Sequence, residues 1–160
     1  MNGEKRRLTR VEVRPLAVAD VPVVEAREPS GQGFVRAMWA LQQEGESLLL
    51  VAWVAGEPVG SAQLDFSASP VELKNLNVHP DTRGQGVGSA LVAAAEEVVR
   101  PRGCLAMGVG VDNSRARALY ERLGYVATGR FSTTTYDYMD ASGATRTATE
   151  TDEMLVKELR

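Results

Sequence analysis

One glycine-rich stretch carries residue types that could bind phosphate groups. The segment Arg83-Gly84-Gln85-Gly86-Val87-Gly88-Ser89 follows an apolar run and precedes a pattern of helical periodicity. The first N–H groups of a helix have no partner inside the helix, and the helix dipole concentrates positive charge there. Glycines let a phosphate approach the backbone closely, and Arg83 adds a fixed positive charge. The stretch therefore predicts a pyrophosphate site.

The spacing of these glycines separates the known phosphate-binding loops. A Walker loop ends in Gly-Lys-Ser/Thr, whereas this stretch ends in Val87-Gly88-Ser89. A dinucleotide-binding fold needs G-x-G-x-x-G in its first strand–helix unit, but these glycines read G-x-G-x-G and follow the fourth expected strand. What remains is either an ordinary glycine-rich turn or the pattern R/Q-x-x-G-x-G/A, read as Arg83-x-x-Gly86-x-Gly88.

A second motif begins 25 residues after Gly88, where Asn113 to Tyr125 read N-x-x-A-x-x-L-Y-x-x-x-G-Y. Together the two motifs resemble those of the GNAT superfamily of N-acetyltransferases, closely from Leu76 to Tyr125 and loosely before Ser47. The resemblance implies a mixed α/β fold (α+β) with a central, mostly antiparallel sheet of about seven strands. It also implies helices on both faces of that sheet and a splay between strands four and five.

The same resemblance implies acetyl-CoA as cosubstrate. Backbone groups of Leu76, Asn77 and Val78 would hold the pantetheine arm, and the Val78 N–H would polarise the thioester carbonyl. The pyrophosphate would be bound by the loop residues Arg83, Gly84, Gln85, Gly86, Val87, Gly88 and Ser89. The second motif would add Asn113, Ala116 and Tyr120, with Asn113 contacting pantetheine or positioning its own helix.

The implied reaction is direct transfer of an acetyl group from the thioester to an amine in a ternary complex. A free alkylamine has a pKa of about 10, so it must lose a proton at neutral pH, and the departing thiolate must gain one. Tyr120 matches the family position of the acid. Its place on an apolar helical face with Leu119 and Leu123 is equally typical of a core residue.

Glu72 is the candidate base, acting directly or through a water. On a regular strand it shares a side with Lys74, Leu76 and Val78 unless a bulge intervenes, and an exposed ion pair with Lys74 is the alternative interpretation. His79, which precedes a proline, is interpreted as a turn residue. Because the chain has one cysteine and one histidine, the sequence predicts neither a disulfide framework nor a Cys/His metal site.

The elements that must position these residues follow from hydrophobic periodicity. After a tail at residues 1–9 we expect a single domain over 10–160. Its expected strands are 9–14, 47–55, 59–66, 71–78, 104–111, 125–138 and 145–159, and its expected helices start at 20, 34, 87 and 114. Residues 29–33 break the first helix. The helix over 34–44 should bury Phe34, Ala37, Met38 and Leu41, and Gly56-Glu57-Pro58 should form a turn.

Composition excludes several classes of protein. The 160 residues are 44% hydrophobic with a net charge of −3, which argues against a disordered chain and against a nucleic-acid partner. The longest apolar run, Leu48 to Ala55, is too short to span a membrane, for which about 20 residues are needed. No secretory signal follows the basic start, so we expect a cytoplasmic protein.

The acceptor cannot be named from the sequence. We expect its site between the loop over 29–34 and the final strand pair, where carboxylates would suit a cationic amine: Asp65, Asp137, Asp140, Glu150, Asp152 and Glu153. The leading hypothesis is a small-molecule amine. The alternatives are a protein or peptide acetyltransferase, acting on N-termini or lysines, and a non-catalytic acyl-CoA-binding module. The exposed edge of the final strand pair is compatible with a homodimer.

Overall fold

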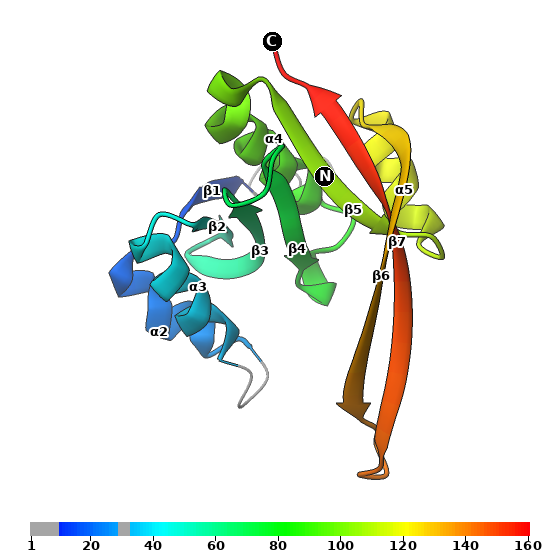
Figure 1. Cartoon of the computed structure of the whole chain (residues 1–160). Helices are drawn as coiled ribbons and strands as arrows, with labels where there is room; N and C mark the ends of the chain where they lie inside the picture. Colours follow the sequence, from blue (N-terminus) through cyan, green and yellow to red (C-terminus); the bar gives the residue numbers. More distant parts are fainter. Residues whose placement is uncertain (1–9, 29–32) are drawn as a thin grey trace, which may run out of the picture. The chain divides into compact units, whose positions relative to one another are not determined.

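The computed structural model describes residues 10–28 and 33–160 (Figure 1). These residues include seven strands: β1 (Val11–Pro15), β2 (Ser47–Val54), β3 (Glu57–Asp65), β4 (Glu72–Val78), β5 (Cys104–Gly110), β6 (Val126–Met139) and β7 (Thr145–Glu158). The α-helices are α2 (Val21–Glu25), α3 (Phe34–Gln43), α4 (Val87–Val99) and α5 (Ser114–Arg122). The predicted fold class, mixed α/β with about seven mostly antiparallel strands, is confirmed.

Two compact units make up the chain, one formed by Met1–Leu105 with Leu159–Arg160 and the other by Ala106–Glu158. The expectation of a single domain over 10–160 stays a prediction, as does the splay between the fourth and fifth strands. None of the helices in the described residues is long and apolar enough to cross a membrane.

In the first unit, β1 to β4 pair antiparallel in chain order and carry helices on both faces. Alternate side chains of β2 point to the face covered by α2 and α3. The core on that face consists of Leu16, Val21, Val24, Val35, Met38, Leu49, Val51 and Trp53. Helix α4 packs on the other face, burying Val87 and Leu91 against β3.

Helix α3 has the expected extent but a different buried side. Gly45, with φ of 77°, follows it as predicted. The buried residues are Val35 and Met38, with Phe34, Trp39 and Leu41 partly buried. Ala37, which we expected in the core, is exposed. The observed buried side of α3 is rotated by about one residue from the predicted one, because Val35 and Met38, at positions i and i+3, face the sheet.

The turn between β2 and β3 lies earlier than predicted. Ala55 and Gly56 both have positive φ, at 51° and 78°, so they form the two-residue loop of a hairpin whose twist matches the strands. Glu57 and Pro58 already belong to β3. The prediction of a Gly56-Glu57-Pro58 turn was wrong because Ala-Gly lacks the Asn or Asp that usually marks such a loop.

Strand β4 contains a bulge that changes which side chains share a face. Ser61 pairs with Asn77 and Gln63 pairs with Lys74, so one residue of β3 faces two residues of β4. Asn75, at φ of 53°, is the residue that accommodates the insertion. The bulge places Glu72, Lys74 and Asn77 on one face and moves Val78 to the other. Glu72 and Val78 therefore lie on opposite sides, which is the bulged case that the prediction excepted.

The second unit is dominated by a long hairpin, in which β6 and β7 lie side by side (Figure 1). The predicted turn over 140–143 is confirmed: Gly143 N–H donates to the Asp140 carbonyl, and Asp140 N–H donates to Ala144. Facing threonine hydroxyls, such as Thr133 with Thr151 at 3.2 Å, link the strands. All of β6 is exposed. The edge of this hairpin is thus available in the chain, while the homodimer stays a prediction.

Candidate functional site

The glycine-rich stretch forms an open connection between β4 and α4. His79 ends the strand, and its Nδ1 accepts the Asp81 N–H at 3.3 Å, which caps the short helix η2 (Pro80–Thr82). The interpretation of His79 as a turn residue is confirmed. Gly84 and Gly86 follow with φ of 79° and 84°, and a Cβ on either would meet nothing within 4 Å. The backbone at these two positions therefore needs glycine for its conformation and remains open to a ligand.

The N-terminus of α4 presents N–H groups toward this opening. Its first helical hydrogen bond runs from Ala90 N to Gly86 O at 3.0 Å. The N–H groups of Val87, Gly88 and Ser89 precede that bond and have no acceptor within the helix. Arg83 is exposed beside them. The N-terminus of this 13-residue helix, with a flanking cation and unobstructed glycines, fits the charge and size of a pyrophosphate group.

Gly60 of β3 fixes how closely α4 approaches the sheet. A Cβ at this position would lie 2.8 Å from the Asn77 carbonyl oxygen, 3.1 Å from Val87 Cγ1 and 3.3 Å from Leu91 Cδ1. Only glycine leaves room for β4 and the first turns of α4 at these distances. The packing at Gly60 thereby positions the candidate phosphate-binding backbone.

The edge of β4 that does not pair with β3 carries the N–H that the sequence singled out. His79 N–H donates to the Val59 carbonyl at 2.7 Å. Because successive N–H groups of a strand point in opposite directions, the Val78 N–H points away from β3. That orientation leaves the Val78 N–H for a partner other than β3, in keeping with the expected contact to the pantetheine arm.

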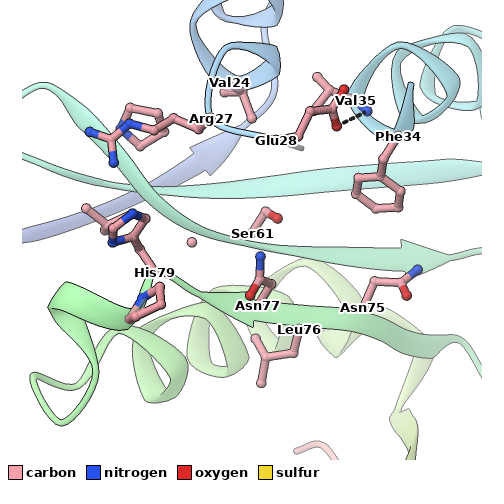
Figure 2. A pocket seen from close by; sticks show the side chains of 14 residues that line it. Val24, Arg27, Glu28, Phe34, Val35, Ser61, Asn75, Leu76, Asn77 and His79 are labelled. Atoms are coloured by element: carbon pink, nitrogen blue, oxygen red, sulfur yellow. Dashed lines mark hydrogen bonds between the residues drawn. The ribbon is translucent and has the colours of Figure 1, made fainter. Parts of the chain in front are cut away.

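A cavity of about 580 Å³ lies on the face of the first unit that carries α2 and α3 (Figure 2). Its floor comes from β3 and β4, including Ser61, Asn75 and Asn77. Its opposite wall is made by the end of α2 and the start of α3, including Glu28 and Phe34. In Figure 2 the Asn77 amide points into the cavity, whereas the Leu76 side chain points away from it. The volume suits a small ligand.

Hydrogen bonds fix two polar side chains of this cavity. The Glu28 carboxylate accepts the Val35 N–H at 3.2 Å, near the positive end of α3. The Asn75 amide donates to Gln63 Oε1 at 2.9 Å, and Gln63 donates to Ser47 Oγ at 3.0 Å. Through these hydrogen bonds, the buried side chains of Ser47 and Gln63 hold the exposed, bulged residue Asn75 in one orientation.

Glu72, the predicted base, belongs to an ion-pair cluster and is not among the residues that line the cavity. Its carboxylate lies 3.8 Å from Lys74 Nζ, and Lys74 donates to Asp65 at 2.9 Å. Hydrogen bonds from Ser67 and then Lys74 lower the pKa of Asp65 to about 2, and Asp65 in turn raises the pKa of Lys74. The alternative interpretation of Glu72, an ion pair with Lys74, is what the geometry shows, and its role as base stays a prediction.

In the second unit, Asn113 and Tyr120 lie on α5. The Asn113 side chain accepts the Ala116 N–H at 3.0 Å and caps the helix. Of the two roles expected for Asn113, this contact corresponds to the positioning of its own helix. Tyr120 is 8% exposed, and its ring packs edge-on against that of Tyr125, with 6.5 Å between the ring centroids. Burial raises the pKa of the Tyr120 hydroxyl. Its contacts to cosubstrate, and those of Ala116, stay predictions.

Several carboxylates that we expected near the acceptor have partners close by. Asp65 holds Lys74, as described above. Glu153 is buried and binds Arg117, and it also accepts the Gly129 N–H at 3.2 Å. Glu150 accepts the Tyr136 hydroxyl at 2.9 Å. Residues 29–32 of the expected acceptor loop lie outside the described residues.

Sequence analysis missed Glu28, Ser61 and Asn75 as cavity residues. They come from the segment that follows α2, from β3 and from β4, which only the tertiary structure brings together. Asn75 carries a signal in its residue type, since asparagine tolerates positive φ better than most residues. Glu28 carries no such signal.

Comparisons with known proteins extend this description. Residues 12–125 match the model of the family described as Acetyltransferase (GNAT) family. Acetyltransferase SG1711 of Sodalis glossinidius (strain morsitans) is 40% identical over 80 residues, which cover 49% of this chain and 56% of the relative. The chain thus spans little more than half the length of that relative.

Two solved structures share the fold. The ribosomal-protein-S18-alanine N-acetyltransferase from Escherichia coli is 22% identical, with a TM-score of 0.65 and 94% of both chains covered. The PaiA N-acetyltransferase from Thermoplasma acidophilum, solved in complex with coenzyme A, is 16% identical, with a TM-score of 0.64. That match covers 93% of this chain and 99% of the other. At these identities the likeness is one of fold.

Proposed function

Because the chain belongs to the acetyltransferase (GNAT) family, we propose that it transfers the acetyl group of acetyl-CoA to a primary amine of a small molecule. The observation that carries this proposal is the opening at the N-terminus of α4, where Arg83, two glycines of positive φ and three helix N–H groups face outward together. The coenzyme A bound to the structural relative from Thermoplasma acidophilum supports the same cosubstrate.

Acetyl-CoA supplies the acetyl group as an activated thioester. The backbone N–H groups of Val87, Gly88 and Ser89, with Arg83, bind its pyrophosphate, and Gly84, Gln85 and Gly86 let the phosphates approach. The backbone of Leu76, Asn77 and Val78 binds the pantetheine arm. The outward Val78 N–H polarises the thioester carbonyl and stabilises the negative charge that develops on its oxygen. Asn113 and Ala116 contribute further contacts from α5.

The transfer requires that the amine nitrogen lose two protons and that the departing sulfur gain one. The amine loses a proton to Glu72 or, since Glu72 does not line the cavity, to a water that relays it. The amine nitrogen then bonds to the carbonyl carbon as the carbon–sulfur bond breaks, and this nitrogen loses its second proton to solvent, from which Tyr120 is reprotonated after the transfer. Tyr120 donates its hydroxyl proton to the departing sulfur, a role for which a pKa raised by burial keeps the hydroxyl protonated at neutral pH.

The acceptor is a small molecule because the cavity on the first unit has the volume of a small-ligand site. Its lining combines apolar side chains with a few fixed polar groups. A protein or peptide acceptor and a non-catalytic acyl-CoA-binding module are the outcomes against which the proposal is tested.

The test measures release of free coenzyme A from acetyl-CoA across a panel of amines, with product masses recorded. The panel contains amino acids, polyamines, aminoglycosides, peptides with free N-termini and lysine peptides. Acetylation of a small amine supports the proposal, and peptide products alone contradict it. Acetyl-CoA binding without any turnover favours the binding module.

Two glycine variants test the phosphate site. Gly86 and Gly143 both have φ of 84° and open space at Cβ, so Gly86→Ala and Gly143→Ala carry the same backbone cost of about 1–2 kcal/mol. Only Gly86→Ala should raise the KM for acetyl-CoA, by about tenfold if it removes about 1.4 kcal/mol of binding. Equal KM values in the two variants would exclude the loop as the pyrophosphate site.

A further inference from the structure

The cavity of the first unit also carries information about the acceptor. We infer that it selects a small, singly cationic amine without a carboxylate, and that Glu28 makes this selection by pairing with the ammonium group. This inference rests on the proposed function for its biological meaning, but the selection itself is a property of the cavity and can be measured by binding alone.

The charges that line the cavity leave one carboxylate uncompensated. Arg27 Nη2 lies 2.6 Å from Glu57 Oε2, so a carboxylate outside the lining neutralises that cation. Glu28 accepts one backbone N–H, from Val35. Within the described part of the chain, no basic side chain forms an ion pair with Glu28. A ligand ammonium would supply the missing positive charge and form charge-assisted hydrogen bonds.

His79, at one end of the cavity, does not alter this balance. Its Nδ1 accepts the Asp81 N–H at 3.3 Å and lies 3.7 Å from Asp81 Oδ2. The Asp81 carboxylate, which does not line the cavity, is therefore the anionic partner of this imidazole. A ligand carboxylate would therefore find no unpaired cation here, while Glu28 would repel it.

The floor of the cavity offers neutral hydrogen-bonding groups. Ser61 and Asn77 present a hydroxyl and an amide from β3 and β4 (Figure 2). Asn75 uses its amide N–H on Gln63, which leaves its carbonyl oxygen as an acceptor. These groups suit hydroxyl or amide substituents on the ligand. Val24, Phe34 and Val35 provide an apolar wall for a short carbon chain.

Serinamide and serine are a matched pair of probes, because they differ only in a neutral amide against a carboxylate. Binding of each to the full chain is measured by NMR titration without acetyl-CoA at pH 6.5, below the α-amino pKa of about 7.7–8.0. We expect serinamide to bind at least about tenfold more tightly than serine, a difference of about 1.4 kcal/mol.

Glu28→Gln isolates the charge, since a glutamine oxygen can still accept the Val35 N–H and preserve the start of α3. This variant should weaken serinamide binding by about tenfold, which corresponds to about 1.4 kcal/mol. Glu25→Gln is the matched control: Glu25 lies on α2, pairs with Arg36, and does not line the cavity. Its serinamide affinity should equal that of the unmodified chain, and thermal unfolding checks that both variants fold.

Three results would overturn the inference: serine binding as tightly as serinamide, no saturable binding of serinamide, or equal affinity in Glu28→Gln and the unmodified chain. Because these titrations contain no acetyl-CoA, their failure is distinct from failure of the proposed function. Loss of selectivity with acetyl transfer intact rejects only the role of Glu28. Selective binding with no transfer to any amine rejects only the acetyltransferase.

Discussion

Replacement of Gly60 by alanine should destabilise the first unit and displace the candidate cosubstrate site. The added Cβ would meet Val87 Cγ1 at 3.1 Å and Leu91 Cδ1 at 3.3 Å, contacts that small side-chain movements can relieve. The Asn77 carbonyl oxygen at 2.8 Å is backbone, so β4 itself must move. Overpacking of this kind costs about 1–3 kcal/mol. At about 2–4 °C per kcal/mol for a chain of this size, Tm should fall by roughly 2–12 °C.

Thermal unfolding of Gly60→Ala measures the stability effect, and the KM for acetyl-CoA measures the displacement of Asn77 and the start of α4. We expect Tm to fall and KM to rise together. Gly108→Ala is the matched control, because it also places alanine in a strand but its Cβ would make an ordinary contact, 3.6 Å from Asp152 Cβ. If Gly60→Ala melted at the same temperature as Gly108→Ala, the argument from close approach would be refuted.

Two further substitutions test separate parts of the structure. Tyr120→Phe should keep Tm and the KM for acetyl-CoA but lower kcat by about 100-fold. Because burial raises the pKa of Tyr120 from its ordinary value of 10.0, the unmodified chain should lose no kcat through this group below that pH. An unchanged kcat in Tyr120→Phe would remove its role as acid. Asp65→Asn should destabilise the chain at neutral pH, because the pKa of Asp65 is lowered to about 2 and its carboxylate stabilises the fold above the ordinary aspartate pKa of 3.8. That difference, followed by urea unfolding, should shrink as pH falls from 3.8 toward 2; a constant difference would contradict the assignment.

The sequence predicted those parts of the fold that depend on local chemistry. Gly45 ends α3, Asn113 caps α5, and Asp140 with Gly143 turns the final hairpin, each within a residue or two of the expected position. The loop between β2 and β3 was misplaced because Ala55 adopts a positive φ that its residue type does not announce. Tertiary pairing of the two strands, rather than local preference, imposes that conformation.

In the candidate site, too, sequence predicted the features that depend on neighbouring residues and missed those that depend on tertiary structure. The glycine loop was found because its residues are contiguous and its chemistry depends on the backbone. The cavity was missed because Glu28 and Asn77 are 49 positions apart in the chain, and neither forms a motif. Glu153, one of the acidic residues expected near the acceptor, binds Arg117 and the Gly129 N–H, and its place near the acceptor stays a prediction.

The bulge at Asn75 sets a constraint on how the length of this chain can change over evolutionary time. Strand β4 carries one phase of side-chain alternation before the bulge and the opposite phase after it. Deletion of that single residue would merge the two phases and leave Asn77 on the cavity side and Val78 on the α4 side, because Lys74 and Asn77 would then be two positions apart. Substitutions in β4 alter one side chain at a time, whereas deletion of another β4 residue, with the bulge retained, would move all side chains on one side of the deletion to the opposite face. The bulge is therefore the position at which β4 can lose a residue without exchanging its polar and apolar faces.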